Sequence, residues 1–178
     1  MNRAASGADI FSTSADCDLL LEALSEASSR YVVEIHAYCL MSNHFHLLAR
    51  SKAGKLSDFM RFAVGRFTRM HNLRRGIDGP LFRGRFMSKE IDSDSHLVEC
   101  LRYIHLNPVR AGLVTTAEQW DFSSARAYLL ADARPSWLVT RDLLAMFGPT
   151  SQHERYSEFL CGGLELQNGV RPGGSDTN

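Results

Sequence analysis

Two histidines placed two residues apart are the first candidates for chemistry. His44 and His46 belong to the segment His44-Phe-His-Leu-Leu-Ala49, whose composition predicts a β-strand. Successive side chains of a strand point to opposite faces, so the two imidazoles share one face while Phe45 points into the core. Two imidazoles at this spacing can hold one divalent metal ion. The apolar residues on both sides favour a central strand; a pair of partly exposed strand histidines without any ligand is the alternative.

A tyrosine and an asparagine form the second candidate group. They lie on a predicted helix that is capped by Asp92 or Asp94 and ends at Pro108. On this helix Tyr103 and Asn107 are four residues apart and share one row, which is separate from the apolar face. If the helix packs beside the histidine strand, Asn107 can complete a metal site while Tyr103 reaches a substrate. The alternative is that Tyr103 is an aromatic residue at the edge of the core and Asn107 a helix-end residue.

Basic residues are concentrated between positions 61 and 89, although the whole chain is neutral. This stretch holds eight basic residues and one acid, Asp78, whereas the chain has 20 Lys and Arg against 20 Asp and Glu. The basic residues are Arg61, Arg66, Arg69, Arg74, Arg75, Arg83, Arg85 and Lys89. Such a local stripe, with phenylalanines between the arginines, indicates a polyanion site or, alternatively, a solvated helix face.

Composition excludes several classes of protein. With 178 residues, of which 44% are apolar and 22% charged, the chain can bury a core as one domain with an appendage. No apolar run approaches the ~20 residues of a membrane span, and Met1 to Asp9 do not resemble a secretory signal. The four cysteines stand far apart with no C-x-x-C pair, so we expect buried thiols in a cytosolic protein.

Periodicity predicts an alternation of helices and strands that would position these side chains. The expected helices cover residues 14–29, 56–73, 94–107, 125–131, 140–147 and 154–160, and the expected strands cover 31–38, 44–49 and 86–91. Thr13 and Asp16 fit a capping box at the first helix. We expect a loose tail from Gly162 onward.

The order helix, strand, strand, helix, strand is most of a ferredoxin-like β-α-β-β-α-β unit. The fold class is therefore α+β: an antiparallel ferredoxin-like sheet with helices on one face and a C-terminal helical extension. Residues 1–12 are small and polar, so the first strand is predicted to be missing, through either a start upstream of Met1 or a trimmed copy. We expect a domain over 1–114, the helical extension over 115–161 and a flexible tail over 162–178.

Three sequence blocks in one order carry a family resemblance. They read Tyr38-Cys-Leu-Met-Ser-Asn-His-Phe-His-Leu-Leu48, Gly79-Pro-Leu-Phe-Arg-Gly-Arg-Phe86 and Leu101-Arg-Tyr-Ile-His-Leu-Asn-Pro-Val-Arg-Ala-Gly-Leu113, followed by Trp120-Asp-Phe-Ser-Ser124. Together they resemble the IS200-like single-tyrosine (Y1, HUH) transposases, and the last block most resembles the branch associated with repetitive extragenic palindromes (REP).

The resemblance implies a metal-dependent DNA strand transferase. His44 and His46 match the metal-binding pair of the family, Asn107 matches the third ligand, and Tyr103 matches the nucleophile that forms a 5′-phosphotyrosine link. Oxygen and imidazole ligands suit Mg²⁺ or Mn²⁺, although two histidines alone do not exclude Zn²⁺. Because a free phenol has a pKa of about 10, a tyrosine nucleophile needs help at neutral pH.

The resemblance also implies the partners. The substrate would be single-stranded DNA folded as a hairpin, with no membrane or small-molecule substrate, and the protein would be cytoplasmic in a bacterium, associated with the nucleoid. Arg83 and Arg85 are the first candidates for DNA contact, followed by Arg69 and Arg102. A monomer is favoured over a dimer.

Two other functions stay open. One is a non-catalytic nucleic-acid-binding protein with a ferredoxin-like sheet, or an inactive remnant of a transposase. The other is a metal hydrolase for small substrates, for which the sequence has no general-base motif. The DNA sequence recognised and the role of the last third are not encoded in any motif of the chain.

Overall fold

The computed structural model describes residues 1–5, 7, 9–130 and 134–168, and from 164 to 168 only the backbone. The elements are β1 (Asn2–Arg3), α1 (Ser14–Tyr31), β2 (Val33–Leu40), β3 (His44–Ser51), α2 (Leu56–Arg75), α3 (Asp94–Arg110), η1 (Ala117–Gln119), α4 (Ala125–Leu129), α5 (Arg141–Leu144), η2 (Ala145–Phe147) and α6 (Gln152–Asn168). The predicted α+β class, with an antiparallel sheet and C-terminal helices, is confirmed.

The sheet is antiparallel and places the histidine strand in its centre. Its order is β1-β3-β2, so β3 has a neighbour on each side. Across the pair of β2 and β3, Cys39 lies opposite His46 and Leu40 opposite Phe45. A register shift near Ile35 interrupts this ladder far from the histidines.

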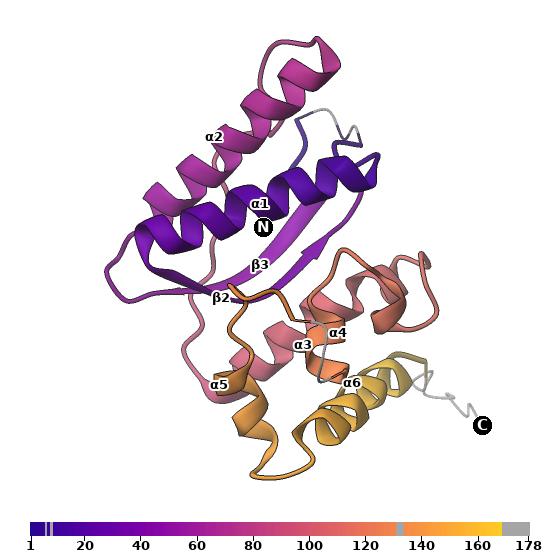
Figure 1. Ribbon diagram of the computed structural model, residues 1–178. Helices are drawn as coiled ribbons and strands as arrows, with labels where there is room; N and C mark the ends of the chain where they lie inside the picture. The colour runs from indigo at the N-terminus through magenta and orange to yellow at the C-terminus, as the bar shows by residue number, and fades with distance from the viewer. Residues whose placement is uncertain (6, 8, 131–133, 169–178) are drawn as a thin grey trace, which may run out of the picture.

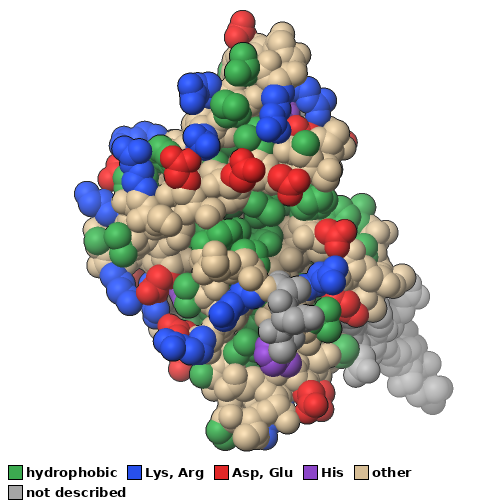
Figure 2. Space-filling view, in the orientation of Figure 1, with side chains coloured by type: hydrophobic (Ala, Val, Ile, Leu, Met, Phe, Trp, Pro, Cys, Tyr) green, Lys and Arg blue, Asp and Glu red, His purple; other side chains and the backbone are tan. Residues whose placement is uncertain are grey.

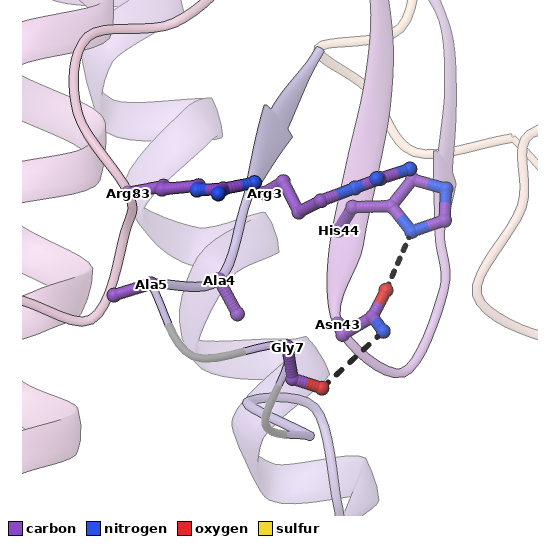
Figure 3. Close-up of a pocket in the computed structure, with 7 residues that line it drawn as sticks. All are labelled: Arg3, Ala4, Ala5, Gly7, Asn43, His44 and Arg83. Carbon is purple, nitrogen blue, oxygen red and sulfur yellow. Dashed lines mark hydrogen bonds between the residues drawn. The ribbon is translucent and has the colours of Figure 1, made fainter.

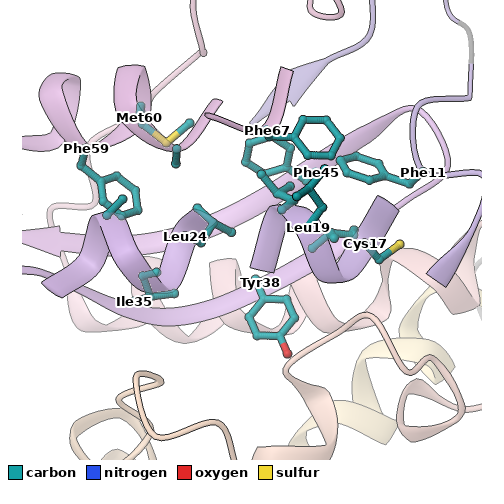
Figure 4. Packing of buried hydrophobic residues seen from close by; sticks show 14 of the residues in the cluster. Phe11, Cys17, Leu19, Leu24, Ile35, Tyr38, Phe45, Phe59, Met60 and Phe67 are labelled. Atoms are coloured by element: carbon teal, nitrogen blue, oxygen red, sulfur yellow. The ribbon is translucent and has the colours of Figure 1, made fainter. Parts of the chain in front are cut away.

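Helices α1 and α2 lie together on one face of the sheet, as Figure 1 shows. The core beneath them is apolar and rich in aromatic rings (Figure 4). Phe45 is fully buried in it, and its ring packs edge-on against Phe11 and Phe82. The burial of Phe45 on this side leaves His44 and His46 on the opposite face, as strand alternation requires.

The start of α1 and the end of α2 are joined by one carboxylate. The predicted capping box is present: the Asp16 amide donates to Thr13 Oγ1 (3.3 Å), and the Thr13 amide donates to Asp16 Oδ2 (3.0 Å). Arg75 also donates to Asp16 Oδ2 (2.7 Å). Burial alone would raise the pKa of the Asp16 carboxyl, but the hydrogen bonds from Thr13 and Arg75 outweigh this effect, so that the pKa is lowered.

The other face of the sheet is covered by α3 and the C-terminal helices (Figure 1). A second apolar cluster there joins Ala37, Cys39 and Leu48 of the sheet to Leu101 of α3 and Tyr156 of α6. The C-terminal helices are therefore packed, together with α3, against the sheet that carries the histidines.

The expectation of a missing first strand is wrong. β1 pairs with β3, with Asn2 opposite Phe45 and Arg3 opposite His44. Two residues are enough to satisfy the edge of β3 there but too few for a recognisable strand pattern. The predicted strand over 86–91 is also wrong: these residues form no regular strand, although Met87 shares two backbone hydrogen bonds with Met1. β1 offers too short a partner for a regular ladder.

Helix α3 differs from its prediction at both ends. Its N-cap is Ser93, whose hydroxyl accepts from the His96 amide (3.3 Å), rather than Asp92 or Asp94. The helix also continues through Pro108 to Arg110. Proline removes one hydrogen bond, and the Ala111 amide, which donates to the Asn107 carbonyl (3.0 Å), closes the end beyond it.

The segment after α3 covers the free edge of β2. The Leu40 amide donates to the Phe122 carbonyl (2.9 Å), the Ser124 amide donates to the Tyr38 carbonyl (3.0 Å), and the Trp120 indole donates to the Leu40 carbonyl (2.8 Å). The block Trp120 to Ser124 therefore protects a sheet edge that would otherwise be unpaired.

The C-terminal helices extend further than predicted in one place. The expectation of a loose tail from Gly162 is wrong up to Asn168, because α6 continues to that residue; residues 169–178 lie outside the described part. α4 ends at Leu129, and residue 131 of its predicted span is likewise outside. None of the helices in the described ranges is long and apolar enough to cross a membrane.

Candidate active site

The two strand histidines contact each other on the face of the sheet that α3 covers. The rings of His44 and His46 are 5.0 Å apart between centroids and nearly perpendicular. His46 is 7% exposed, while His44 is only half-buried. The predicted shared orientation of the two imidazoles is therefore present, with His44 nearer to solvent.

Tyr103 of α3 meets this pair. Its ring lies edge-on to His46, with 5.3 Å between centroids and 86° between planes. The side chain is 46% exposed, so a phenol with its ring on the imidazole remains open to a substrate. The guanidinium of Arg110 lies over the Tyr103 ring, 5.5 Å from its centroid. Tyr103 is therefore not buried inside the core.

Asn107 lies one turn beyond Tyr103 on the same helix. Its Nδ2 donates to the Tyr103 carbonyl (2.8 Å), which leaves Oδ1 as a free acceptor in the amide. Among the described residues, no hydrogen bond joins Asn107 to either imidazole. The helix therefore holds the side chain in one orientation, and its oxygen is the atom available for a ligand.

Asn43, which sequence reasoning missed, fixes the tautomer of His44. Asn43 Oδ1 is an acceptor 2.8 Å from His44 Nδ1, and Asn43 Nδ2 donates to the Gly7 carbonyl (3.5 Å), as Figure 3 shows. His44 must carry its proton on Nδ1, so the lone pair is on Nε2. An outer partner of this kind is typical of metal-binding histidines.

Burial keeps both histidines neutral at physiological pH. It lowers the pKa of His46 to about 4, with a further contribution from the neighbouring His44 and the charge of Arg3. The pKa of His44 is lowered for the same main reason. His46 Nε2 is buried and has no hydrogen-bond partner among the described residues. A neutral imidazole with an unused nitrogen suits metal coordination.

The side chains at this site could hold a metal ion only if an oxygen atom joins the two imidazole nitrogens. In the described part of the chain, no group of three His, Cys, Asp or Glu side chains gathers at one point. His44 and His46 offer two nitrogen donors, and Asn107 Oδ1 is the oxygen on α3 that the family pattern would add. The residues present fit an ion that completes its coordination with substrate and water oxygens.

A groove of about 630 Å³ opens beside His44 (Figure 3). It is lined by Arg3, Ala4, Ala5, Gly7, Asn43, His44 and Arg83. Arg3 extends from β1 toward His44, and the Arg83 amide donates to the Arg3 carbonyl (3.0 Å). Neither arginine forms an ion pair with any described acid, so the groove carries uncompensated positive charge.

The basic stripe divides into two groups. Arg61, Arg66 and Arg75 pair with acids at 2.7, 3.0 and 2.7 Å, and acidic and basic side chains are interleaved over α1 and α2 in Figure 2. Arg69, Arg74, Arg83, Arg85 and Lys89 form no ion pair within the described residues, although Arg74 donates to the Ala15 carbonyl of α1 (3.2 Å). About half of the stripe therefore stabilises the helix layer.

Arg102 stands apart from the other predicted DNA contacts. Its guanidinium pairs with Glu99 (2.5 Å) and lies over the Phe159 ring, 4.6 Å from the centroid. The side chain thus packs α3 on α6, whereas Arg83 lines the groove at His44.

The protein thus has an α+β fold in which one tyrosine, on α3, faces a histidine pair on the central strand of the sheet. A sequence profile described as "Transposase IS200 like" matches residues 8–107, and the chain belongs to this family. The resemblance identified from the three sequence blocks is confirmed.

Two individual proteins are similar to this chain. One, from Haemophilus influenzae, is assigned as a REP-associated tyrosine transposase; it is 27% identical over 133 residues, which cover 68% of this chain and 76% of that protein. The other is a solved structure of a REP-associated tyrosine transposase bound to a REP hairpin. Its fold matches with a TM-score of 0.60 at 18% identity, over 78% of this chain and 81% of the other.

Proposed function

We propose that this protein is a metal-dependent enzyme that cleaves and rejoins single-stranded DNA folded as a hairpin. The observation that carries the proposal is the contact between the exposed Tyr103 ring and His46, which itself contacts His44. Membership of the IS200-like transposase family supports it, as does the REP hairpin bound by the structural relative.

In the proposed reaction, the Tyr103 oxygen attacks the phosphorus of a DNA phosphodiester. The bond between phosphorus and the 3′ oxygen breaks, the phenol loses its proton to solvent, and the departing 3′ oxygen takes up a proton. The products are a 5′-phosphotyrosine and a free 3′-hydroxyl. Because one phosphodiester replaces another, the reverse attack by a 3′-hydroxyl rejoins strands without ATP.

His44, His46 and Asn107 are the residues that would hold the ion. When bound, a divalent metal polarises the phosphate oxygens and stabilises the charge that develops on them. Members of this family generally depend on a metal. Mg²⁺ or Mn²⁺ best suits a set with amide, water and phosphate oxygens, with Zn²⁺ as the alternative.

Positive side chains around the site would bind the DNA backbone. We assign Arg3 and Arg83, in the groove at His44, to phosphates next to the reacting bond, and Arg85 and Arg69 to more distant phosphates. Arg102 is the weakest candidate, because Glu99 and Phe159 already occupy its guanidinium. In this proposal the protein acts on DNA in the cytoplasm and works as a monomer.

The test is covalent capture of a labelled hairpin oligonucleotide with a single-stranded extension, in the presence of Mn²⁺. We expect a denaturant-stable adduct with the wild type and none with Tyr103→Phe. Tyr31→Phe is the matched control, because Tyr31 packs on Phe62 under α2 and should leave the adduct unchanged. Binding without an adduct in the wild type would instead indicate a non-catalytic binding protein or an inactive remnant.

A further inference from the structure

A buried chain of polar groups links α6 to α3 and to β2. His105 is fully buried; its Nδ1 contacts the hydroxyl of Tyr156 in α6, and its Nε2 lies 2.7 Å from Ser124 Oγ. Ser124 Oγ in turn lies 3.1 Å from the Tyr38 carbonyl and accepts from the Tyr38 amide at 2.9 Å. Four segments distant in sequence thus meet through one imidazole.

Only one arrangement of protons satisfies every member of this chain. The Tyr156 hydroxyl donates to His105 Nδ1, His105 Nε2–H donates to Ser124 Oγ, and the Ser124 hydroxyl donates to the Tyr38 carbonyl. In the other tautomer, the Tyr156 hydroxyl would have no acceptor among the described groups. Because every donor and acceptor is used, this series of hydrogen bonds selects one relative placement of α3 and β2.

Two members of this hydrogen-bonded series lie next to residues of the candidate active site. His105 is two residues from Tyr103, and Tyr38 precedes Cys39, the residue opposite His46 in the sheet. A shift or rotation of α3 that moved Tyr103 away from His46 would therefore also break the bonds of His105. None of these groups contacts the open side of the site, so they cannot touch a substrate themselves.

We propose that Tyr156, acting through His105 and Ser124, is a positioning residue that holds Tyr103 against the histidine pair. The inference rests on the proposed function, in which Tyr103 is the nucleophile. It gives the C-terminal extension a role: α6 fixes the nucleophile helix on the sheet. A displacement of about 1 Å in a reacting group can lower a rate by about 100-fold, so a small loosening of α3 is enough to matter.

The chain offers a closely matched pair of variants. Tyr156 and Tyr128 are both fully buried, and their rings lie 5.8 and 5.1 Å from the His105 ring. The Tyr128 hydroxyl, however, donates to the His36 carbonyl of β2 (2.8 Å) rather than to His105. Tyr156→Phe and Tyr128→Phe therefore each remove one buried hydroxyl and keep the ring, but only Tyr156→Phe opens the bond to α3.

The experiment measures adduct formation at saturating hairpin, hairpin affinity and Tm for both variants of the full chain. We expect both variants to show similar decreases in Tm and to bind the hairpin within about twofold of the wild-type affinity. The cleavage rate should fall only in Tyr156→Phe, by roughly 10- to 100-fold. Equal rate losses in both variants, or a wild-type rate in Tyr156→Phe, would overturn the proposal.

A second readout separates this inference from the proposed function. Amide hydrogen exchange over Leu101–Asn107 should become faster in Tyr156→Phe and stay unchanged in Tyr128→Phe. If the wild type forms no adduct but exchange responds in this way, the proposed catalysis fails while the positioning of Tyr103 stands. If exchange in this segment responds equally to both changes, the positioning inference fails even where the adduct forms.

Discussion

Arg3 lies directly opposite His44 in the register between β1 and β3. A two-residue strand thereby places a guanidinium beside the more exposed imidazole of the pair. Arg83 reaches the same groove from the loop that follows α2, and its backbone is bonded to that of Arg3. β1 therefore lies between the two other parts of the groove, the start of β3 with His44 and the loop with Arg83.

The first prediction concerns DNA binding in this groove. Arg3→Gln and Arg83→Gln should each weaken binding of a hairpin with a single-stranded extension and reduce the salt dependence of log K by about one unit. Binding is measured by fluorescence anisotropy against salt concentration in the Tyr103→Phe background, so that cleavage does not interfere. A hairpin without the extension should lose less affinity.

Arg141→Gln serves as the control for that prediction. Arg141 is 89% exposed beside Asp142, which pairs with Arg50 near the end of β3 opposite to His44. We expect its affinity and salt slope to match the wild type. Equal losses in all three variants would indicate diffuse electrostatic attraction without a groove site.

The second prediction concerns Asn43. Asn43→Ala removes the acceptor that holds the proton of His44 on Nδ1, so the ring can turn and its Nε2 lone pair is no longer fixed. Loss of such a partner lowers metal affinity by about 10- to 100-fold. Mn²⁺ titration followed by isothermal calorimetry measures the change. Ser42→Ala, at the exposed neighbouring position, should leave Mn²⁺ affinity unchanged.

The third prediction separates metal binding from DNA affinity. His44→Ala should abolish cleavage while most hairpin affinity remains, because the proposed phosphate contacts are made by the arginines of the groove and not by the imidazole. Cleavage and anisotropy are measured on the same preparation. A collapse of affinity together with cleavage would show that His44 binds DNA directly or supports the fold.

The fourth prediction is a pH dependence of stability. Burial lowers the pKa of His46 to about 4 and that of His105 to about 3, whereas an exposed histidine titrates near 6.5. Between these values the unfolded chain binds more protons, so stability rises with pH and falls as pH drops from about 6.5 to about 4. Each such histidine contributes a slope of at most about 1.4 kcal/mol per pH unit.

Urea unfolding in EDTA from pH 4 to pH 7 measures this slope. His46→Gln should reduce it, since one of the suppressed protonations is lost. An unchanged slope in His46→Gln would assign the acid sensitivity to other groups.

The fifth prediction concerns the turn between α1 and β2. Val32 caps α1 in the left-handed conformation (φ 53°, ψ 50°) and is 74% exposed. This backbone conformation costs a β-branched residue roughly 1–2 kcal/mol, and little apolar burial compensates. Val32→Gly should therefore raise the free energy of unfolding by about 1 kcal/mol. Val32→Ala keeps most of the strain and should change it little; a loss of stability in Val32→Gly would contradict the prediction.

The sequence predicted those features that depend on local periodicity. The two-residue repeat of a strand placed His44 and His46 on one face, and the capping box located the start of α1 within one residue. The family pattern added Tyr103, which no local rule connects to a strand more than fifty residues earlier.

Contacts between distant segments were beyond sequence reasoning. The arginine stripe looked free because Glu26 and Asp16, which neutralise Arg66 and Arg75, lie on another helix. The tail looked loose because Gly162 and Gly163 suggest a break. In the fold, a Cβ at Gly163 would stand 2.7 Å from Arg102 Cδ, so this glycine permits close packing of α6 on α3.

The order of Tyr103, His105 and Tyr156 along the sequence has a consequence for synthesis. The histidine strand, the groove and Tyr103 all leave the ribosome before α6 does. Until Tyr156 emerges, His105 lacks its hydroxyl partner, and α3 lacks the helix that packs it on the sheet. We therefore expect that a chain still attached to its ribosome holds the proposed ligands and nucleophile but becomes competent only once α6 has been made.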